Sequence, residues 1–203
     1  MEKIWIDWVV ELQSIAQAGL CYSKDVYDIE RFERIREITA EIMSKQSDLP
    51  IEIVKDLFCN ETGYQTPKMD TRAAIFQDGK ILLVKERDTW SLPGGWIDVN
   101  ESVKSNTIKE VKEEAGLDAV PVRLIAVQDR NKHNTPQYAY GICKIFVLCD
   151  IISGEFKQNS ETSESKFFAA DDLPELDNAK NTAQQIHMCF DAYQDNNWTV
   201  QFD

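Results

Sequence analysis

The sequence predicts an α/β protein in which a mixed sheet carries packed helices, preceded by a small all-helical N-terminal domain. Residues 1–62 place apolar side chains at helical spacing. From Gly63 onward, strand-like runs lie on both sides of one helical segment, an order typical of a mixed sheet with helices packed on it. We therefore expect two domains, over residues 1–62 and 63–203. A chain of 203 residues, 43% hydrophobic and 28% charged, is long enough to fold both.

Three helices are expected before Gly63. The first carries an apolar series at helical spacing: Ile4, Trp8, Leu12, Ile15 and Gly19. Asp25 is expected to cap the second, which presents Phe32, Ile35, Thr39 and Ile42 on one stripe. Asp48 is expected to cap the third, with Pro50 near its first turn. So small a bundle needs further packing, which predicts either a homodimer contact or a contribution to a substrate pocket.

The second domain is expected to begin with a hairpin. Residues 71–77 and 80–85 form its strands, and Asp78-Gly79 is the two-residue turn signal between them. A short extended piece follows over residues 90–93. Asn100 is expected to cap a helix over about 101–115, which Gly116 ends. Later strands are expected over 122–127, 142–152 and 166–169, and a final helix over about 179–194.

Charge and cysteine content exclude several classes of protein. Lys and Arg number 22 against 35 Asp and Glu, giving a net charge of −13, which argues against a broad basic face for nucleic acid or membrane. No apolar run reaches the roughly 20 residues that span a bilayer, and the acidic N-terminus lacks a signal-peptide pattern. Five widely spaced cysteines without a CxxC pair argue against zinc and a disulfide framework. We expect reduced thiols in a cytoplasmic protein.

The chemistry is concentrated in residues 94–117. Glu110, Glu113 and Glu114 fall at i, i+3 and i+4 of the expected helix, and therefore on one face. Such a row is self-repelling, and oxygen-rich clusters are what Mg²⁺ or Mn²⁺ require. The alternative is an acidic face that only meets solvent.

The wider spacing favours the metal site. Residues 95–117 resemble the box of the Nudix family, with matching positions at Gly95, Glu101, Lys109, Glu110, Glu113, Glu114, Gly116 and Leu117. This resemblance implies an α/β/α sandwich and a Mg²⁺- or Mn²⁺-dependent hydrolase of nucleoside diphosphates linked to a moiety X. By the family pattern, metal would be held by Glu110, Glu113, Glu114 and the Gly95 carbonyl, while Glu101 would support the loop. Lys109 replaces the family's Arg and is expected to orient a glutamate as a point charge, since Lys cannot bind a carboxylate bidentately.

Metal-assisted attack of water on phosphorus also needs a base. The catalytic carboxylates are expected among Glu113, Glu114, Glu161 and Glu164. Glu114 lies in the box, whereas Glu161 and Glu164 lie in the later segment SETSES, which could also be a polar surface loop. The sequence does not choose between these bases.

Substrate contacts are expected outside the box. The candidates are Arg72, Arg87, Asp129, Arg130 and His133, with ordinary surface or salt-bridged roles as the alternative. Trp90, Tyr138 and Tyr140 could stack on a base or enclose a choline-like cation, or simply pack in the core.

The outer motifs resemble bacterial CDP-choline pyrophosphatases. They are Thr66-Pro67-Lys68, WSLPGGW at 90–96, AVQDRNKH at 126–133 and SETSESKFF at 160–168. The resemblance implies hydrolysis of CDP-choline to CMP and phosphocholine. ADP-ribose or another nucleotide sugar is the alternative substrate within this class. Processing of RNA ends by the same chemistry is a further alternative, which the net charge of −13 disfavours. A non-catalytic ligand sensor is the least favoured alternative, because the box glutamates are intact.

Overall fold

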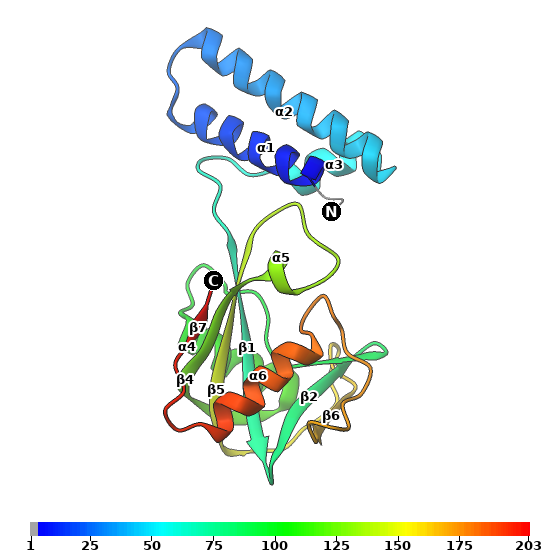
Figure 1. The fold of residues 1–203 in the computed structure, drawn as a ribbon, viewed down its shortest axis with the longest axis vertical. Coiled ribbons are helices and arrows are strands. Elements are labelled where there is room, and N and C mark those ends of the chain that lie inside the picture. Colours follow the sequence, from blue (N-terminus) through cyan, green and yellow to red (C-terminus); the bar gives the residue numbers. More distant parts are fainter. Residues whose placement is uncertain (1–3) are drawn as a thin grey trace. The chain divides into compact units, whose positions relative to one another are not determined.

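The structure is a computed structural model that describes residues 4–203 and divides the chain into two units, Met1–Pro67 and Lys68–Asp203. Figure 1 shows helices alone in the first unit and a sheet with helices in the second. The predicted helical region before an α/β domain is thereby confirmed, while the boundary after residue 62 stays a prediction.

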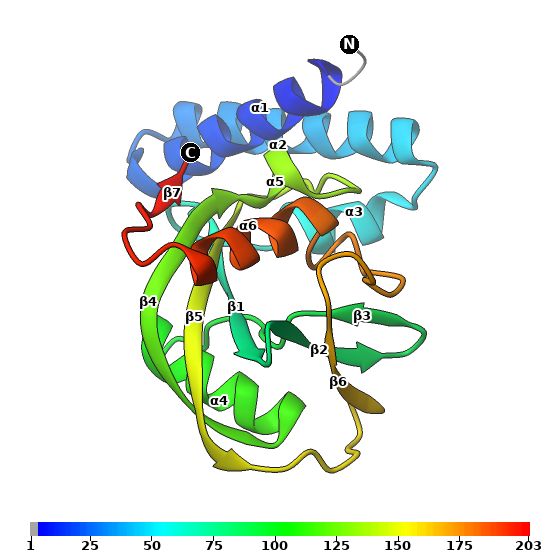
Figure 2. The same ribbon diagram turned by 60° about the horizontal axis from the view of Figure 1, so that its bottom comes forward.

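The first unit consists of α1 (Ile4–Tyr22), α2 (Val26–Ser47) and α3 (Ile51–Phe58). Figures 1 and 2 show α1 and α2 side by side, and their contact buries small and apolar residues of both helices. These include Val9, Ala16, Ala40 and Met43. Asp25 caps α2 as predicted, because its side chain accepts hydrogen bonds from the N–H groups of Tyr27 and Asp28.

The predicted cap of the third helix is wrong. Asp48 ends α2 in the left-handed conformation, at φ 56°, which the short polar side chain of Asp tolerates better than most residues do. Pro50 precedes α3 and makes no side-chain cap. The apolar residues of α3 still face inward, since Val54 and Phe58 are buried.

The second unit is built on a seven-stranded mixed sheet in the order β3-β2-β1-β5-β4-β7, with β6 paired to β2. The strands are β1 (Lys68–Gln77), β2 (Lys80–Glu86), β3 (Thr89–Ser91), β4 (Leu117–Asp129), β5 (Ile142–Gly154), β6 (Glu164–Phe168) and β7 (Gln201–Phe202). The β1–β5 and β4–β7 pairs are parallel, and the other pairs are antiparallel. The predicted hairpin is present, with Asp78 and Gly79 both at positive φ in its turn.

Helices cover both faces of the sheet. They are α4 (Val103–Ala115), α5 (Arg130–His133) and α6 (Ala183–Gln194). Consecutive residues of β1 alternate between two hydrophobic clusters: Ala73 and Ile75 join the cluster of α4, and Ala74 joins that of α6. Figure 2 shows these two helices separated by the strands. The predicted α/β/α sandwich is confirmed.

Several predicted bounds need correction. Helix α4 begins at Val103, because Ser102 and Ser105 form a reciprocal capping box; Asn100 is therefore not its cap, and Glu101 precedes the helix. Gly116 ends α4 as predicted, at φ 71°. Helix α6 begins at Ala183 after a second capping box, between Thr182 and Gln185. Neither α5 nor β7 was predicted from the sequence.

All five cysteines are free thiols. Within residues 4–203, no helix is long and apolar enough to cross a membrane.

Candidate active site

The loop before α4 is fixed to the edge of β1 by backbone hydrogen bonds. Thr71 N donates to the Gly95 carbonyl over 3.0 Å, and Ala73 N donates to the Pro93 carbonyl over 2.8 Å. Gly94 adopts φ +145°, and a Cβ there would lie 1.9 Å from the Thr71 carbonyl oxygen. Only glycine allows this close approach.

Two box glutamates lie against the Gly94-Gly95 turn. Glu114 is buried, and its Oε2 accepts a hydrogen bond of 2.8 Å from Gly94 N. Glu110 lies beside the next residue, since a Cβ on Gly95 would be 2.9 Å from Glu110 Oε2. The Glu113 side chain is 56% exposed. The helical spacing thus brings Glu110 and Glu114 to one turn and leaves Glu113 open to solvent.

The electrostatics of this turn disfavour extra negative charge. Burial raises the pKa of Glu114 to about 7; Glu110 and Glu161 act in the same direction, while Arg72 and the Gly94 N–H oppose them. Burial also raises the pKa of Glu110, with Glu113 adding to the effect and Lys109 and Arg72 opposing it. These carboxylates lack enough positive partners, which is the condition that a bound cation relieves.

The donor chemistry of the turn fits a hard divalent cation, because every candidate ligand is an oxygen. Within residues 4–203, however, no three His, Cys, Asp or Glu side chains are already gathered closely enough to hold a metal. The Gly95 carbonyl accepts from Thr71 N over 3.0 Å and from Asn106 Nδ2 over 3.4 Å. Glu101 lies just before α4, where its N–H donates to the Asp98 carbonyl.

Lys109 lies among carboxylates. Its Nζ is 2.8 Å from Asp98 Oδ2, 3.8 Å from Glu110 and 3.9 Å from Glu113. The hydrogen bond to Asp98 raises the pKa of Lys109. This geometry is that of a point charge shared between acids, and Asp98 is a partner that was not predicted from the sequence.

The segment that contains Glu161 is tied to the end of α4. Asn159 Nδ2 donates to the Glu113 carbonyl, and Thr162 Oγ1 donates to the Glu114 carbonyl, each over 2.8 Å. The Glu161 charge is close enough to raise the pKa of both Glu110 and Glu114. Glu164 lies on β6 instead, in ion pairs with Lys85 and Lys166. The structure therefore brings Glu161 to the box and holds Glu164 in other contacts.

A buried ionic cluster adjoins the box. The Arg72 guanidinium bonds to Asp70, with Nη2 2.9 Å from Oδ1 and Nε 3.2 Å from Oδ2. Lys144 Nζ lies 2.7 Å from Asp70 Oδ2. Burial disfavours the charged form of Arg72, but Asp70 and Glu114 outweigh it and raise its pKa. Neither Asp70 nor Lys144 was predicted as a site residue, although a charged residue inside an apolar strand was a usable signal in both β1 and β5.

The other predicted substrate contacts do not gather at one point. Arg130 is buried and stacks on the Tyr138 ring, 3.5 Å from its centroid. Asp129 caps α5 through Asn131 N. His133 Nε2 lies 2.5 Å from Asp203 Oδ2, and Arg87 is exposed in the β2–β3 turn.

The predicted aromatic contacts are split in the same way. Trp90 is buried and packs edge-on against Phe168, which is the core-packing alternative. The ring centroids of Tyr138 and Tyr140 lie 5.5 Å apart, on the loop that follows α5.

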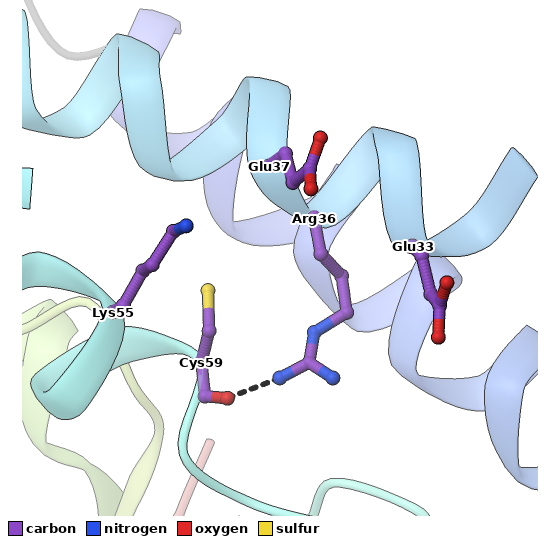
Figure 3. A pocket seen from close by; sticks show the side chains of 5 residues that line it. All are labelled: Glu33, Arg36, Glu37, Lys55 and Cys59. Carbon is purple, nitrogen blue, oxygen red and sulfur yellow. Dashed lines mark hydrogen bonds between the residues drawn. The ribbon is translucent and has the colours of Figure 1, made fainter. Parts of the chain in front are cut away.

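A separate pocket lies within the first unit (Figure 3). It is lined by Glu33, Arg36, Glu37, Lys55 and Cys59. Arg36 donates a hydrogen bond to the Cys59 carbonyl across it. Because acids and bases are mixed in its lining, this pocket shows no clear preference for a ligand charge.

Comparison with known families decides which family this box represents. Residues 67–189 match the NUDIX domain profile, which covers more than half of the chain. The chain belongs to the Nudix family. Residues 3–58 of this Nudix hydrolase match a second profile, described as a UDP-X-like, N-terminal oligomerisation domain.

Relatives of this Nudix hydrolase carry related names. A putative ADP-ribose pyrophosphatase, YjhB of Bacillus subtilis (strain 168), is 44% identical over 189 residues, which is 92% of this chain and 91% of the relative. The crystal structure of an ADP-ribose pyrophosphatase from Streptococcus suis 89-1591 is 53% identical, with a TM-score of 0.64 over 68% of this chain and all of that one. A UDP-X diphosphatase structure is 35% identical, with a TM-score of 0.65 over 97% of both chains. The prediction of a Nudix pyrophosphohydrolase is confirmed, and Nudix hydrolases generally need divalent metal ions.

Proposed function

We propose that this Nudix hydrolase cleaves the pyrophosphate bond of a nucleoside diphosphate linked to X, with Mg²⁺ or Mn²⁺ as cofactor. The observation that carries the proposal is the convergence of Glu110 and Glu114 on the Gly94-Gly95 turn. Burial raises the pKa of both carboxyls, which supports a site that needs a cation.

In this proposal Glu110, Glu113, Glu114 and the Gly95 carbonyl hold the metal. When bound, the divalent cation neutralises pyrophosphate charge and lowers the pKa of an attacking water. Glu101 supports the loop before α4, and Lys109 orients Glu110 and Glu113 as a shared point charge. Gly116 ends α4 and so sets the length of the helix that carries the glutamates.

We favour Glu161 as the base that accepts the proton of the attacking water. Asn159 and Thr162, on either side of Glu161, donate hydrogen bonds to carbonyl groups at the end of α4. The Glu161 charge also raises the pKa of Glu110 and of Glu114. Glu164 is less suited, because the hydrogen bonds from Lys166 and Lys85 lower its pKa and occupy its carboxylate. Glu114 is the second candidate, because it lies inside the box.

Arg72 is a candidate to bind phosphoryl oxygens near the metal, since its charge acts on both Glu110 and Glu114. It would have to leave Asp70 or the Leu92 carbonyl to reach a substrate. Arg87, Asp129 and His133 remain predicted contacts. His133 would have to leave its contact with Asp203 to reach a substrate.

Two substrates compete within the proposed class. The outer motifs resemble CDP-choline pyrophosphatases and favour CDP-choline, with CMP and phosphocholine as products. The names of the relatives from Bacillus subtilis and Streptococcus suis favour ADP-ribose. Action on RNA ends is the weaker alternative, because the net charge of −13 disfavours extended contact with a polyanion.

The test is product release from CDP-choline, ADP-ribose, a UDP-sugar and a short 5′-triphosphate RNA, each with Mg²⁺, with Mn²⁺ and with EDTA. Glu113→Gln is the inactive comparison, and Glu155→Gln, a change of an exposed glutamate, is the matched control. Metal-dependent turnover that Glu113→Gln abolishes supports the proposal. Turnover that persists in EDTA would overturn it.

We also propose that the oligomer is a homodimer formed through the first unit. The matched oligomerisation profile over residues 3–58 supports an oligomer. Exposed apolar side chains at helical spacing on α1, namely Trp8, Leu12 and Ile15, support this helix as the contact.

A further inference from the structure

Arg130 is a buried cation at the start of α5. The residue is 1% exposed, and none of the ion pairs found between residues 4 and 203 includes it. Its Nη1 donates to the Pro136 carbonyl over 2.5 Å and to Asn131 Oδ1 over 3.2 Å. Its Nε and Nη2 are buried and have no hydrogen-bond partner among the residues that the structure describes. A buried, unpaired charge is strongly unfavourable, so this edge of the guanidinium requires an acceptor.

The guanidinium is held in place. It stacks on the Tyr138 ring at 3.5 Å, an arrangement that attracts a cation to the ring face. Asn131 fixes that tyrosine from both sides of its backbone, by donating to the Tyr138 carbonyl over 2.8 Å and accepting from Tyr138 N over 2.9 Å. The free Nε–Nη2 edge is therefore a preorganised feature of the loop after α5.

The surroundings of Arg130 are short of negative charge. Asp70 already bonds to both Arg72 and Lys144. Burial is the main cause of the lowered pKa of Lys144, and the nearby charge of Arg130 lowers this pKa further. Asp70 therefore bonds two buried cations, Arg72 and Lys144, and its charge also favours the protonated form of Arg130. An added anion would balance the three cations.

We propose that Arg130 and Lys144 form a subsite for a phosphoryl oxyanion of the substrate, next to the phosphoryl group that the box glutamates act on. The Nε–Nη2 edge of an arginine matches two oxygens of one phosphoryl group, and Lys144 adds a point charge. Asp70 is the positioning residue, because it holds Lys144 and Arg72. This proposal rests on the proposed function for the identity of the ligand.

The subsite is closed in the structure, since both Arg130 and Lys144 are 1% exposed. Entry of an anion therefore requires the loop that carries Tyr138 to move. Binding should change the protection of amide hydrogens in residues 134–141, which hydrogen exchange measures.

The test is calorimetric titration of inorganic pyrophosphate into the full-length protein in EDTA. We expect Arg130→Met and Lys144→Met to weaken binding by roughly tenfold to a hundredfold, which is the range expected for a lost hydrogen bond to a charged group. The pyrophosphate affinity of Arg130→Lys should lie between those of Arg130→Met and the wild type. Lysine keeps the positive charge but lacks the paired Nε and Nη2 donors of the guanidinium. With metal and substrate, Arg130→Met should raise KM and leave the metal concentration for half-maximal activity unchanged.

Arg123→Met is the matched control. Within residues 4–203 the Nε of Arg123 is likewise buried and unpartnered, but its other nitrogens donate to the carbonyl groups of Ala192, Asp195 and Asn196, which lie at the end of α6 and after it. Arg123→Met should bind pyrophosphate with the affinity of the wild type. Equal weakening in Arg123→Met and Arg130→Met would show a packing effect and overturn the proposal. Unchanged pyrophosphate affinity in Arg130→Met would also overturn the proposal. Water, and not the ligand, would then be the acceptor for Nε and Nη2 of Arg130.

Two further titrations distinguish a phosphoryl subsite from a carboxylate-binding site and from the box itself. Malonate replaces pyrophosphate in the first, and Arg130-dependent binding of malonate but not of pyrophosphate would overturn the phosphoryl assignment. Glu113→Gln is titrated in the second, and it should bind pyrophosphate normally while it abolishes turnover. If no nucleotide is hydrolysed but Arg130-dependent binding persists, the proposed function fails and the subsite stands.

Discussion

Lys144 donates a hydrogen bond of 2.7 Å to Asp70 inside the sheet, from the equivalent register position on the neighbouring parallel strand. Both residues are almost fully buried, at 1% and 5% exposure. The same carboxylate also holds Arg72, whose charge reaches Glu114 of the Nudix box. This pair therefore links the middle of the sheet to the proposed catalytic turn, and its stability and titration are measurable.

Asp70→Asn should destabilise the second unit far more than Lys144→Met. The first change leaves Arg72 and Lys144 without their shared carboxylate, and an uncompensated buried charge costs about 3–5 kcal/mol. The second change leaves Asp70 paired with Arg72 and should cost clearly less. Urea denaturation measures both, with the exposed Glu155→Gln as a control that should stay within about 0.5 kcal/mol. Equal, small effects of all three changes would contradict the prediction.

Lys144 should also make stability depend on alkaline pH. Burial lowers its pKa from 10.5 to about 8, with Arg72 adding to the effect and Asp70 opposing it. Between these two values the unfolded chain holds a proton that the folded chain has released, so the free energy of unfolding rises with pH, by at most about 1.4 kcal/mol per unit. Below pH 8 both states are protonated, and the full cost of the buried charge remains.

The comparison with Lys144→Met isolates this effect. The difference in unfolding free energy between wild type and variant should shift in favour of the wild type as pH rises from 8 to 10.5. Urea denaturation at several pH values in this range measures it. Parallel pH profiles of the two proteins would show that Lys144 keeps an ordinary titration.

Glu114→Gln should abolish most activity without unfolding the protein. Its amide oxygen can still accept the hydrogen bond from Gly94 N, but the charge proposed to hold metal is gone. We expect turnover to fall by about 10²–10⁴-fold, the range typical of a lost catalytic carboxylate, and the melting temperature to stay equal or rise. A Mn²⁺ titration of activity and a thermal melt measure these two effects. A fully active variant would remove Glu114 from the proposed site.

Two neighbouring glycines should respond differently to alanine. Gly94→Ala places a Cβ 1.9 Å from a backbone oxygen at a strained positive φ, so we expect a loss of stability of at least about 1–3 kcal/mol. In Gly95→Ala the atoms nearest to the new Cβ belong to the Glu110 carboxylate, at 2.9 Å, and this end of the side chain can rotate away. This second variant should keep its melting temperature and lose metal affinity. The opposite order of stability loss would contradict the geometry of the turn.

Leu12→Glu should weaken the proposed dimer. Leu12 lies between Trp8 and Ile15 on α1, and these three side chains are 41%, 61% and 51% exposed. A charge at the centre of an apolar contact is disfavoured because it must be desolvated. Light scattering should give twice the chain mass for the wild type and a shift toward the single-chain mass for Leu12→Glu. Glu11→Gln is the control, and a monomeric wild type at micromolar concentration would remove the dimer.

Features that depend on nearby residues were predicted well from the sequence. The helical repeat predicted Glu110, Glu113 and Glu114 on one face; Glu110 and Glu114 meet at the Gly94-Gly95 turn, while Glu113 is open to solvent. The Nudix spacing indicated the family and the sandwich. The Asp78-Gly79 turn and the Asp25 cap follow from the local preferences of single residues. The predicted cap of α4, Asn100, was wrong, because the reciprocal bonds of Ser102 and Ser105 cap this helix instead.

Contacts between distant parts of the chain could not be predicted in this way. Asp70 and Lys144 meet only because β1 and β5 pair in one particular register. The burial of Arg130 depends on the loop that carries Tyr138, and the pairing of β7 with β4 depends on the return of the last residues to the sheet.

The sequence by itself determined the family, the longer helices and strands and the set of box glutamates, since these depend on spacing along one helix or strand, whereas the short α5 and β7 escaped it. Only the tertiary structure decided which charges are buried and which acids and bases share a partner. The physical reason is that burial and ion pairing depend on distances through space, which sequence separation does not encode.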